Sequence, residues 1–155
     1  MKKIIIDANL LVLLVVGLTK PDLIGRHKRT KSFEIADFEL LTKALSNFEQ
    51  IIVTPHILTE ASNLISQIAE PAASTLRNTL SELLSTQQEE FEPSSEITTH
   101  SFFLRLGLTD CAILRIVEKE VPVITTDLDL YLAAAKSNPN AINFTYLRQE
   151  RLVGI

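Results

Sequence analysis

The chain has 155 residues, of which 46% are hydrophobic and 22% charged. This composition excludes a disordered segment, and the length suits a single domain over residues 1–155 with a substantial core. The formal net charge of −4 argues against a protein that coats DNA, although it leaves room for a local basic patch. The single cysteine, Cys111, excludes an internal disulfide framework and is typical of a reducing cytoplasm.

Several kinds of site are excluded because their motifs are missing. Four glycines leave no room for a GxxxxGK[ST] phosphate loop or a GxGxxG turn. There is no CxxC pair and no cluster of histidines and cysteines, which argues against zinc. Neither His56 nor His100 is accompanied by a GxSxG elbow or a Ser/His/Asp order, so covalent hydrolysis has no support.

The N-terminal segment superficially resembles a signal peptide. Asp7 and Asn9 interrupt its hydrophobic stretch, and no A-x-A-like cleavage site follows. The apolar run Leu10–Leu18 is far shorter than the roughly 20 residues of a membrane span. We therefore predict a buried helix here, and a soluble cytoplasmic protein without a membrane partner.

Strand-like runs recur along the chain with helical stretches between them. These runs are Lys3–Ile6, Gln50–Val53, Val121–Thr125 and Ile142–Leu147. Short, nearly continuous β-branched runs are typical of strands buried on both faces of a parallel sheet. The pattern predicts an α/β fold of three layers, in which a central parallel sheet of four or five strands is flanked by helices.

The helical stretches follow from apolar spacing and from capping signals. Thr54 and Pro55 form an N-cap and first helical position, and Pro71 separates the resulting helix from the next one. Thr109 is expected to cap a later helix, and Gly107 to end the one before it. The other expected helices are Ser32–Phe48, Ala72–Leu84, Ser94–Leu106, Asp110–Lys119 and, as the last clear one, Asp127–Ala135, with a loop over Glu89–Pro93.

Four acidic residues occupy positions where a carboxylate is costly unless it has a partner. Asp7 ends the first strand-like run, and Asp127 ends another. In an open α/β sheet, ligands bind beyond the carboxyl ends of the strands. Glu60 lies at the edge of the apolar stripe of its helix. Asp110 shares a helical face with apolar residues, so it should face the sheet.

Each of these acids also has an ordinary explanation. Asp7 and Asp127 are suitable as loop residues or helix caps, and Glu60 as a solvated helix residue. Asp110 is a common choice for a first helical turn, where the helix dipole favours it. The topology nevertheless brings all of them toward one edge of the sheet. A hard divalent cation with oxygen ligands is the simplest partner for several carboxylates at once.

Segments around these acids resemble the PIN-domain family of metal-dependent ribonucleases, which includes toxins of type II toxin–antitoxin pairs. The resemblance is carried by the order and spacing of short motifs, and it spans nearly the whole chain. The motifs are Ile5-Ile6-Asp7-Ala8-Asn9, Thr54-Pro55-His56-Ile57-Leu58-Thr59-Glu60, Leu108-Thr109-Asp110-Cys111-Ala112-Ile113-Leu114 and Thr125-Thr126-Asp127-Leu128-Asp129-Leu130.

The resemblance implies an acidic pocket that holds Mg²⁺ or Mn²⁺ and hydrolyses RNA phosphodiester bonds with a metal-activated water. The catalytic, metal-binding residues would be Asp7, Glu60, Asp110 and Asp127, with Asp129 as an auxiliary metal ligand. Auxiliary polar roles, in orienting a ligand or water, would fall to Asn9, Thr125 and Thr126. As turn and strand-end residues, these three also have ordinary structural roles.

Two segments depart from a compact toxin domain. Residues 19–31 contain a basic run in which Arg26, Lys28 and Arg29 are candidates for gripping an RNA backbone, with a solvated loop as the alternative. The helix pair after Glu60 is long, and it is a candidate for a homodimer face or for a groove that takes a cognate antitoxin. Ordinary core packing of its leucines is the alternative.

Two other functions compete with the ribonuclease. One is a non-catalytic PIN-like module that binds RNA or protein, which the intact set of acids disfavours. The other is a phosphotransfer α/β domain, since Asp127-Leu128-Asp129 resembles the D-x-D of aspartate-nucleophile phosphatases. In those enzymes the pair should follow the first strand, whereas Asp7 here is followed by Ala8-Asn9.

Overall fold

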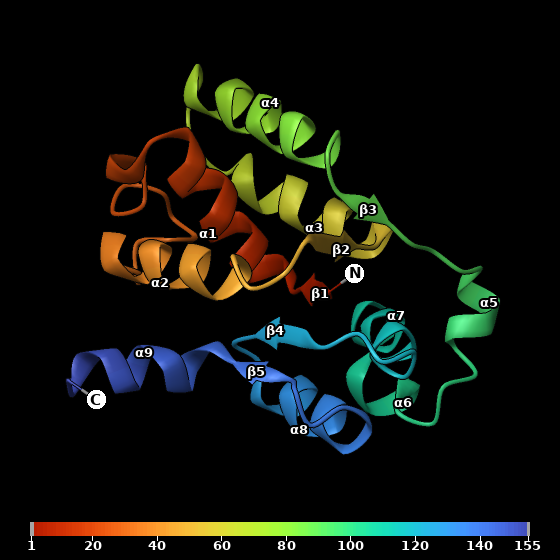
Figure 1. Ribbon diagram of the computed structural model, residues 1–155. Coiled ribbons are helices and arrows are strands. Elements are labelled where there is room, and N and C mark those ends of the chain that lie inside the picture. The colour runs from red at the N-terminus through yellow and green to blue at the C-terminus, as the bar shows by residue number, and fades with distance from the viewer. Residues whose placement is uncertain (1, 155) are drawn as a thin grey trace.

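A computed structural model describes residues 2–154, so the two ends of the predicted domain, residues 1 and 155, lie outside the described part. The fold is α/β, with a five-stranded parallel sheet in the order β3-β2-β1-β4-β5 within residues 2–154 (Figure 1). This confirms the predicted fold class. The strands are β1 (Lys3–Ile6), β2 (Gln50–Val53), β3 (Gln88–Glu89), β4 (Val123–Thr125) and β5 (Ile142–Asn143).

Strand β1 occupies the centre of the sheet because its side chains are apolar on both faces. Ile4, Ile5 and Ile6 are fully buried. Ile5 lies opposite Ile52 of β2 on one side and opposite Val123 of β4 on the other. A central strand of a parallel sheet is covered by helices above and below, which explains the continuous run of isoleucines.

Helices lie on both faces of the sheet. Figure 1 shows α1 to α4 on one side and α6, α7 and α8 on the other. Helix α9 contacts α2 across the fold. The helices are α1 (Ala8–Thr19), the 3-10 turn η1 (Pro21–Leu23), α2 (Ile35–Leu45), α3 (Pro55–Ile65), α4 (Ala72–Leu84), α5 (Ser94–Ile97), α6 (Phe103–Leu106), α7 (Leu108–Val117), α8 (Leu128–Ser137) and α9 (Phe144–Leu152).

Helix α1 is the buried helix that the apolar run predicted. It contacts α2, α3 and α4, and its residues from Leu10 to Gly17 are buried. Gly17 allows the ring of Phe38 on α2 to lie directly against the α1 backbone, where any Cβ would collide with that ring. In residues 2–154, no helix has the length and apolarity that a membrane crossing requires.

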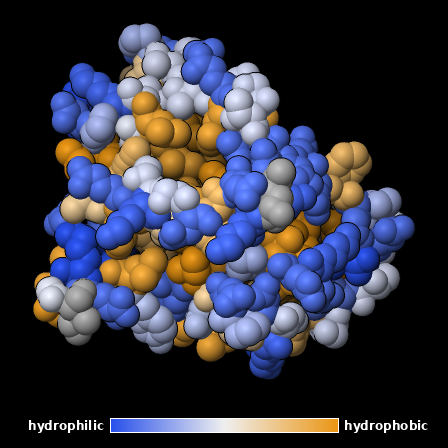
Figure 2. All heavy atoms as spheres, in the orientation of Figure 1, coloured by the Kyte–Doolittle hydropathy of each residue, from blue (hydrophilic) through white to orange (hydrophobic). Residues whose placement is uncertain are grey.

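The helix pair after Glu60 contributes to the core. Leu76 and Leu80 of α4 are buried, while Leu83 and Leu84 pack against the core and stay partly exposed. Figure 2 shows that hydrophilic residues cover most of the visible face, with hydrophobic residues reaching the surface in the area below α4. The ordinary reading of these leucines as core residues therefore accounts for most of their burial.

Some predicted elements were wrong in the middle of the chain. Glu89 was expected in a loop, but it belongs to β3, whose two residues pair with Ile52 and Val53. The helix expected over Ser94–Leu106 is two short helices, α5 and α6. Between them the ring Nδ1 of His100 accepts a 3.1 Å hydrogen bond from the backbone N–H of Phe102, in place of a helical carbonyl.

Two helix boundaries also differ from the prediction. Helix α7 begins at Leu108, after Gly107 in a positive-φ conformation of 87°, so Thr109 lies inside the helix and is not its cap. The expected strand Ile142–Leu147 stops at Asn143, whose side chain accepts a 3.2 Å hydrogen bond from the N–H of Tyr146. That cap starts α9, a helix the sequence did not predict.

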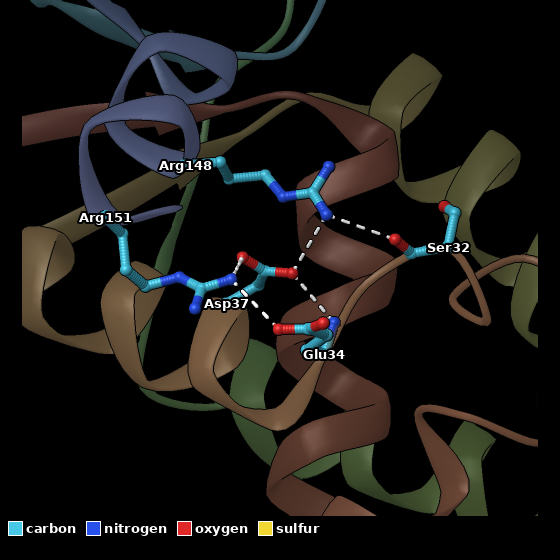
Figure 3. Close-up of polar contacts among 5 residues, drawn as sticks. All are labelled: Ser32, Glu34, Asp37, Arg148 and Arg151. Atoms are coloured by element: carbon cyan, nitrogen blue, oxygen red, sulfur yellow. Dashed lines mark hydrogen bonds and ion pairs between the residues drawn. The ribbon is translucent and has the colours of Figure 1, made fainter. Parts of the chain in front are cut away.

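An ion cluster attaches α9 to α2. The fully buried carboxylate of Asp37 accepts hydrogen bonds of 3.0 Å from Arg148 and 2.9 Å from Arg151 (Figure 3). It also accepts a 2.7 Å bond from the backbone N–H of Glu34. Burial alone would raise the pKa of Asp37, but these donors outweigh it and hold the pKa below its ordinary value.

Candidate active site

Asp7 lies at the carboxyl end of the central strand, where β1 turns into α1. It is buried, and its Oδ1 accepts a 2.8 Å hydrogen bond from the backbone N–H of Ala8 at the start of α1. Its Oδ2 accepts a 2.7 Å bond from the hydroxyl of Thr125. Burial raises the pKa of Asp7, and the charge of Asp127 adds to the rise, although both hydrogen bonds act against it.

Asp127 lies beyond the end of the neighbouring strand, β4. Its backbone N–H donates a 2.9 Å hydrogen bond to the hydroxyl oxygen of Thr125, which in turn donates to Asp7. Its Oδ1 caps α8 by accepting a 3.1 Å bond from the N–H of Leu130. Asp7 and Asp127 therefore both begin helices, which agrees with their alternative explanation as helix caps. The same turns place them side by side at the sheet edge.

Asp110 enters the site from the first turn of α7. Its neighbours on the same helical face, Ile113, Leu114 and Val117, are all buried, which confirms that this face is turned toward the core. Partial burial raises the pKa of Asp110 to about 7, and the negative charges of Asp7, Asp127, Glu60 and Asp129 contribute in that order. The carboxylates of the three other acidic segments are thus close enough to repel Asp110.

Glu60 comes from α3 and is the most loosely held of the four principal acids. Its side chain is exposed, and it lines an open hollow with His56 and Thr109. Burial raises the pKa of Glu60, and the charge of Asp7 raises it further. Because α3 packs against α7, this hollow lies between the segments that carry Glu60 and Asp110.

The auxiliary residues differ in their roles. Thr125 is fully buried and connects Asp7 to Asp127 through the two hydrogen bonds described above. Asp129 is exposed in the first turn of α8. Asn9 and Thr126 both line a second hollow, together with two residues of the basic run.

The acids fit a divalent cation by their chemistry. The donors are carboxylate oxygens, which Mg²⁺ and Mn²⁺ prefer, and their mutual repulsion would be relieved by a positive ion. Within residues 2–154, no three acidic, histidine or cysteine side chains already stand in an arrangement that holds a metal. Binding would therefore require the side chains to move closer together. Glu60 and Asp129 are exposed, whereas Asp127, also exposed, is held by its hydrogen bond at the start of α8.

Part of the basic run lines the second hollow. Lys28 and Arg29 are exposed and line it together with Asn9 and Thr126. Arg26 is also exposed but does not line this hollow. Two of the three predicted RNA-binding residues therefore share a hollow with residues that neighbour Asp7 and Asp127 in the chain.

Sequence reasoning missed two residues that line these hollows. Arg148 joins Lys28 and Arg29, but its segment followed an expected strand and carried no motif. His56 lies beside Glu60, and its Nδ1 is buried without a hydrogen-bond partner in the described part of the chain. His56 also lines a small pocket with Phe91 and Ile97, which belong to segments distant in sequence.

Comparisons with known proteins identify no family: no protein-family model matches the chain, and no curated protein matches it. What the structure defines is an α/β fold with a five-stranded parallel sheet, order 3-2-1-4-5, whose carboxyl edge carries a group of interacting carboxylates.

Proposed function

We propose that the chain is a metal-dependent endoribonuclease with the PIN-like arrangement that its four acidic segments resemble. The observation that carries the proposal is the position of Asp110, whose pKa of about 7 reflects burial and then the charges of four other carboxylates. Such repulsion destabilises the metal-free fold, and a cluster of carboxylates with raised pKa values is a candidate functional site. Binding a cation through oxygen ligands is the function that fits an all-carboxylate set.

Some residues of the site would bind the ion, and Thr125 would hold one of these ligands in position. Asp7, Glu60, Asp110 and Asp127 would hold a Mg²⁺ or Mn²⁺ ion, with Asp129 at the exposed side. A bound ion supplies a nucleophilic hydroxide at neutral pH and neutralises the charge of the phosphodiester under attack. Thr125 fixes the carboxylate of Asp7 by its 2.7 Å hydrogen bond, so that this ligand needs no reorientation.

The proposal also predicts how the protonation of Asp110 affects activity. Asp110 carries a proton for part of the time near neutral pH, because its pKa is raised to about 7. Cation binding would displace that proton, since a carboxylate must be ionised to act as a ligand. Activity should therefore rise with pH through the neutral range.

The experiment is a cleavage assay with single-stranded RNA in Mn²⁺, in Mg²⁺ and in EDTA. We expect cleavage with either metal and none in EDTA. Asp110→Asn should be inactive, while Asp22→Asn, which changes an exposed acid on η1, should cut like the wild type. Cleavage by Asp110→Asn at the wild-type rate would contradict the proposal and would indicate a contaminating nuclease. RNA binding without cleavage would instead support a non-catalytic module.

A further inference from the structure

One hollow of the protein surface has a basic lining. It is open to solvent. Its lining residues are Asn9, Lys28, Arg29, Ser32, Phe33, Thr126, Thr145 and Arg148. The lining contains Lys and Arg but no Asp or Glu, although the protein as a whole has a net charge of −4. The hollow is therefore a locally positive site on an acidic protein.

The loop that supplies Lys28 and Arg29 is held in place by His27. The ring of His27 is fully buried, with Nε2 at 3.0 Å from the carbonyl of Ile65, and Nδ1 accepts a 3.0 Å hydrogen bond from the N–H of Arg29. Thr30 is also fully buried and donates a 2.7 Å bond to the carbonyl of Ile24. The loop backbone is thus fixed before any ligand arrives, which lowers the entropic cost of binding.

Arg148 lines the hollow from α9. Its Nη2 donates to Asp37 at 3.0 Å and to the carbonyl of Ser32 at 3.1 Å, and its other terminal nitrogen points away from both (Figure 3). The guanidinium carbon lies 4.8 Å from the centre of the Phe33 ring. These contacts hold the arginine rigidly while leaving it able to donate to an anion.

The hollow and the acids are joined through the backbone. Asn9 is two residues beyond Asp7, and Thr126 directly precedes Asp127. The lining of the hollow therefore includes residues within two positions of the acids that follow β1 and β4. We propose that Lys28, Arg29 and Arg148 bind a backbone phosphate of the RNA strand, next to the phosphodiester at the carboxylates. This inference rests on the proposed ribonuclease function, because it takes RNA as the ligand.

Binding is best measured without cleavage. A fluorescent single-stranded RNA of about eight nucleotides, titrated in EDTA at several salt concentrations, gives the affinity and its salt dependence. Lys28→Ala and Arg29→Ala should each weaken binding about three- to tenfold and reduce the salt slope by about 1. Lys31→Ala is the matched control, because Lys31 is exposed in the same loop but does not line the hollow. Equal effects of Lys28→Ala and Lys31→Ala would overturn the proposal.

Arg148 requires a control for stability, since it also neutralises Asp37. Arg151→Ala removes the other arginine of the same cluster, and Arg151 does not line the hollow. Both arginine variants should lower the melting temperature, but only Arg148→Ala should weaken RNA binding and flatten the salt dependence. If both variants weaken binding equally, the effect comes from α9 as a whole and the assignment of Arg148 is wrong.

The two proposals fail in different ways. If RNA binds through Lys28 and Arg29 but is not cut in Mn²⁺, the result would contradict the proposed ribonuclease activity and support phosphate binding in the hollow. If the wild type, Lys28→Ala and Arg29→Ala all cut RNA with the same KM, the result would contradict phosphate binding in the hollow and support the ribonuclease activity. Absence of any RNA binding in EDTA at low salt would overturn the proposal that the hollow binds a backbone phosphate.

Discussion

The hydroxyl of Thr125 donates a 2.7 Å hydrogen bond to Asp7, although the two residues are 118 positions apart in the chain. The same hydroxyl oxygen accepts a 2.9 Å bond from the N–H of Asp127. One buried threonine therefore connects the ends of β1 and β4 and sets the separation of the two acids that follow them. The position of the carboxylates is determined by the pairing of the strands and not by a loop.

Replacing Thr125 with Val should show how much the hydroxyl contributes to stability, apart from the packing of the side chain. Valine keeps the shape but leaves Asp7 and the N–H of Asp127 without the hydroxyl, so the free energy of unfolding should fall by about 1–3 kcal/mol. Thr125→Ser should restore most of it. Urea unfolding measures the effect, and equal stability of the Val and Ser variants would show that the hydroxyl contributes nothing.

Asp7→Asn should abolish metal-dependent cleavage of RNA, with a loss of at least about 100-fold in kcat/KM. The fold should remain intact, because the folded chain raises the pKa of Asp7 and thus disfavours its charge. The melting temperature of the metal-free variant should therefore stay level or rise. Cleavage kinetics and thermal unfolding test both parts, and wild-type activity in this variant would remove Asp7 from the site.

Asp110 makes the stability of the metal-free protein depend on pH. Its pKa rises from 3.8 to about 7 on folding, so the folded chain keeps a proton that the unfolded chain releases in this interval. The corresponding stabilisation is complete at acidic pH and is lost as the pH rises through about 7, a change of roughly 2–4 kcal/mol. Urea unfolding in EDTA between about pH 5 and 8 measures it. Asp110→Asn should lose this part of the pH dependence, and an unchanged profile would contradict the raised pKa.

Millimolar Mn²⁺ should raise the melting temperature of the wild type by about 5–10 °C, because the ion binds the folded carboxylates and not the unfolded chain. The double variant Asp7→Asn, Asp110→Asn should show no shift. The wild-type shift should be larger at pH 8 than at pH 6, since protons compete for the same carboxylates. A wild-type protein that melts at the same temperature with and without Mn²⁺ would count against the metal site.

Asp37→Ala should destabilise the fold by about 3 kcal/mol or more, because it leaves two partly buried arginines without their carboxylate. Glu39→Ala, at an exposed position of the same helix, should change stability little. The pKa of Asp37 is lowered on folding, so its contribution is present above about pH 4 and is lost at lower pH. Chemical unfolding of both variants at neutral pH tests the difference.

The sequence predicted the sheet well where local patterns and tertiary structure agree. Lys3–Ile6 and Gln50–Val53 are strands with the predicted bounds, because their apolar runs are buried in the middle of the sheet. Glu89 could not be recognised as a strand residue from a polar segment, since β3 is only two residues long and is held by pairing to β2. Edge pairing of this kind has no hydrophobic signature.

In the candidate site too, residues with a local sequence signal could be predicted, and residues placed by tertiary contacts could not. Asp7 and Asp127 could be predicted because each ends an apolar strand, and the carboxyl ends of parallel strands meet at one edge. Arg148 could not, because its place depends on the helix that the Asn143 cap begins, and on the distant carboxylate of Asp37. The basic run was visible in the sequence, but which of its cations line the hollow depends on how the buried His27 holds the loop.

The Asp37 cluster also has a consequence for synthesis on the ribosome. Asp37 is translated 111 residues before Arg148, so a nascent chain carries the carboxylate long before either arginine exists. An unpaired carboxylate cannot be buried at low cost, so α2 should not adopt its final packing before Arg148 and Arg151 have been synthesised. The emergence of α9 would then complete the fold in one late step. Prematurely terminated chains would keep an exposed, protease-sensitive N-terminal half.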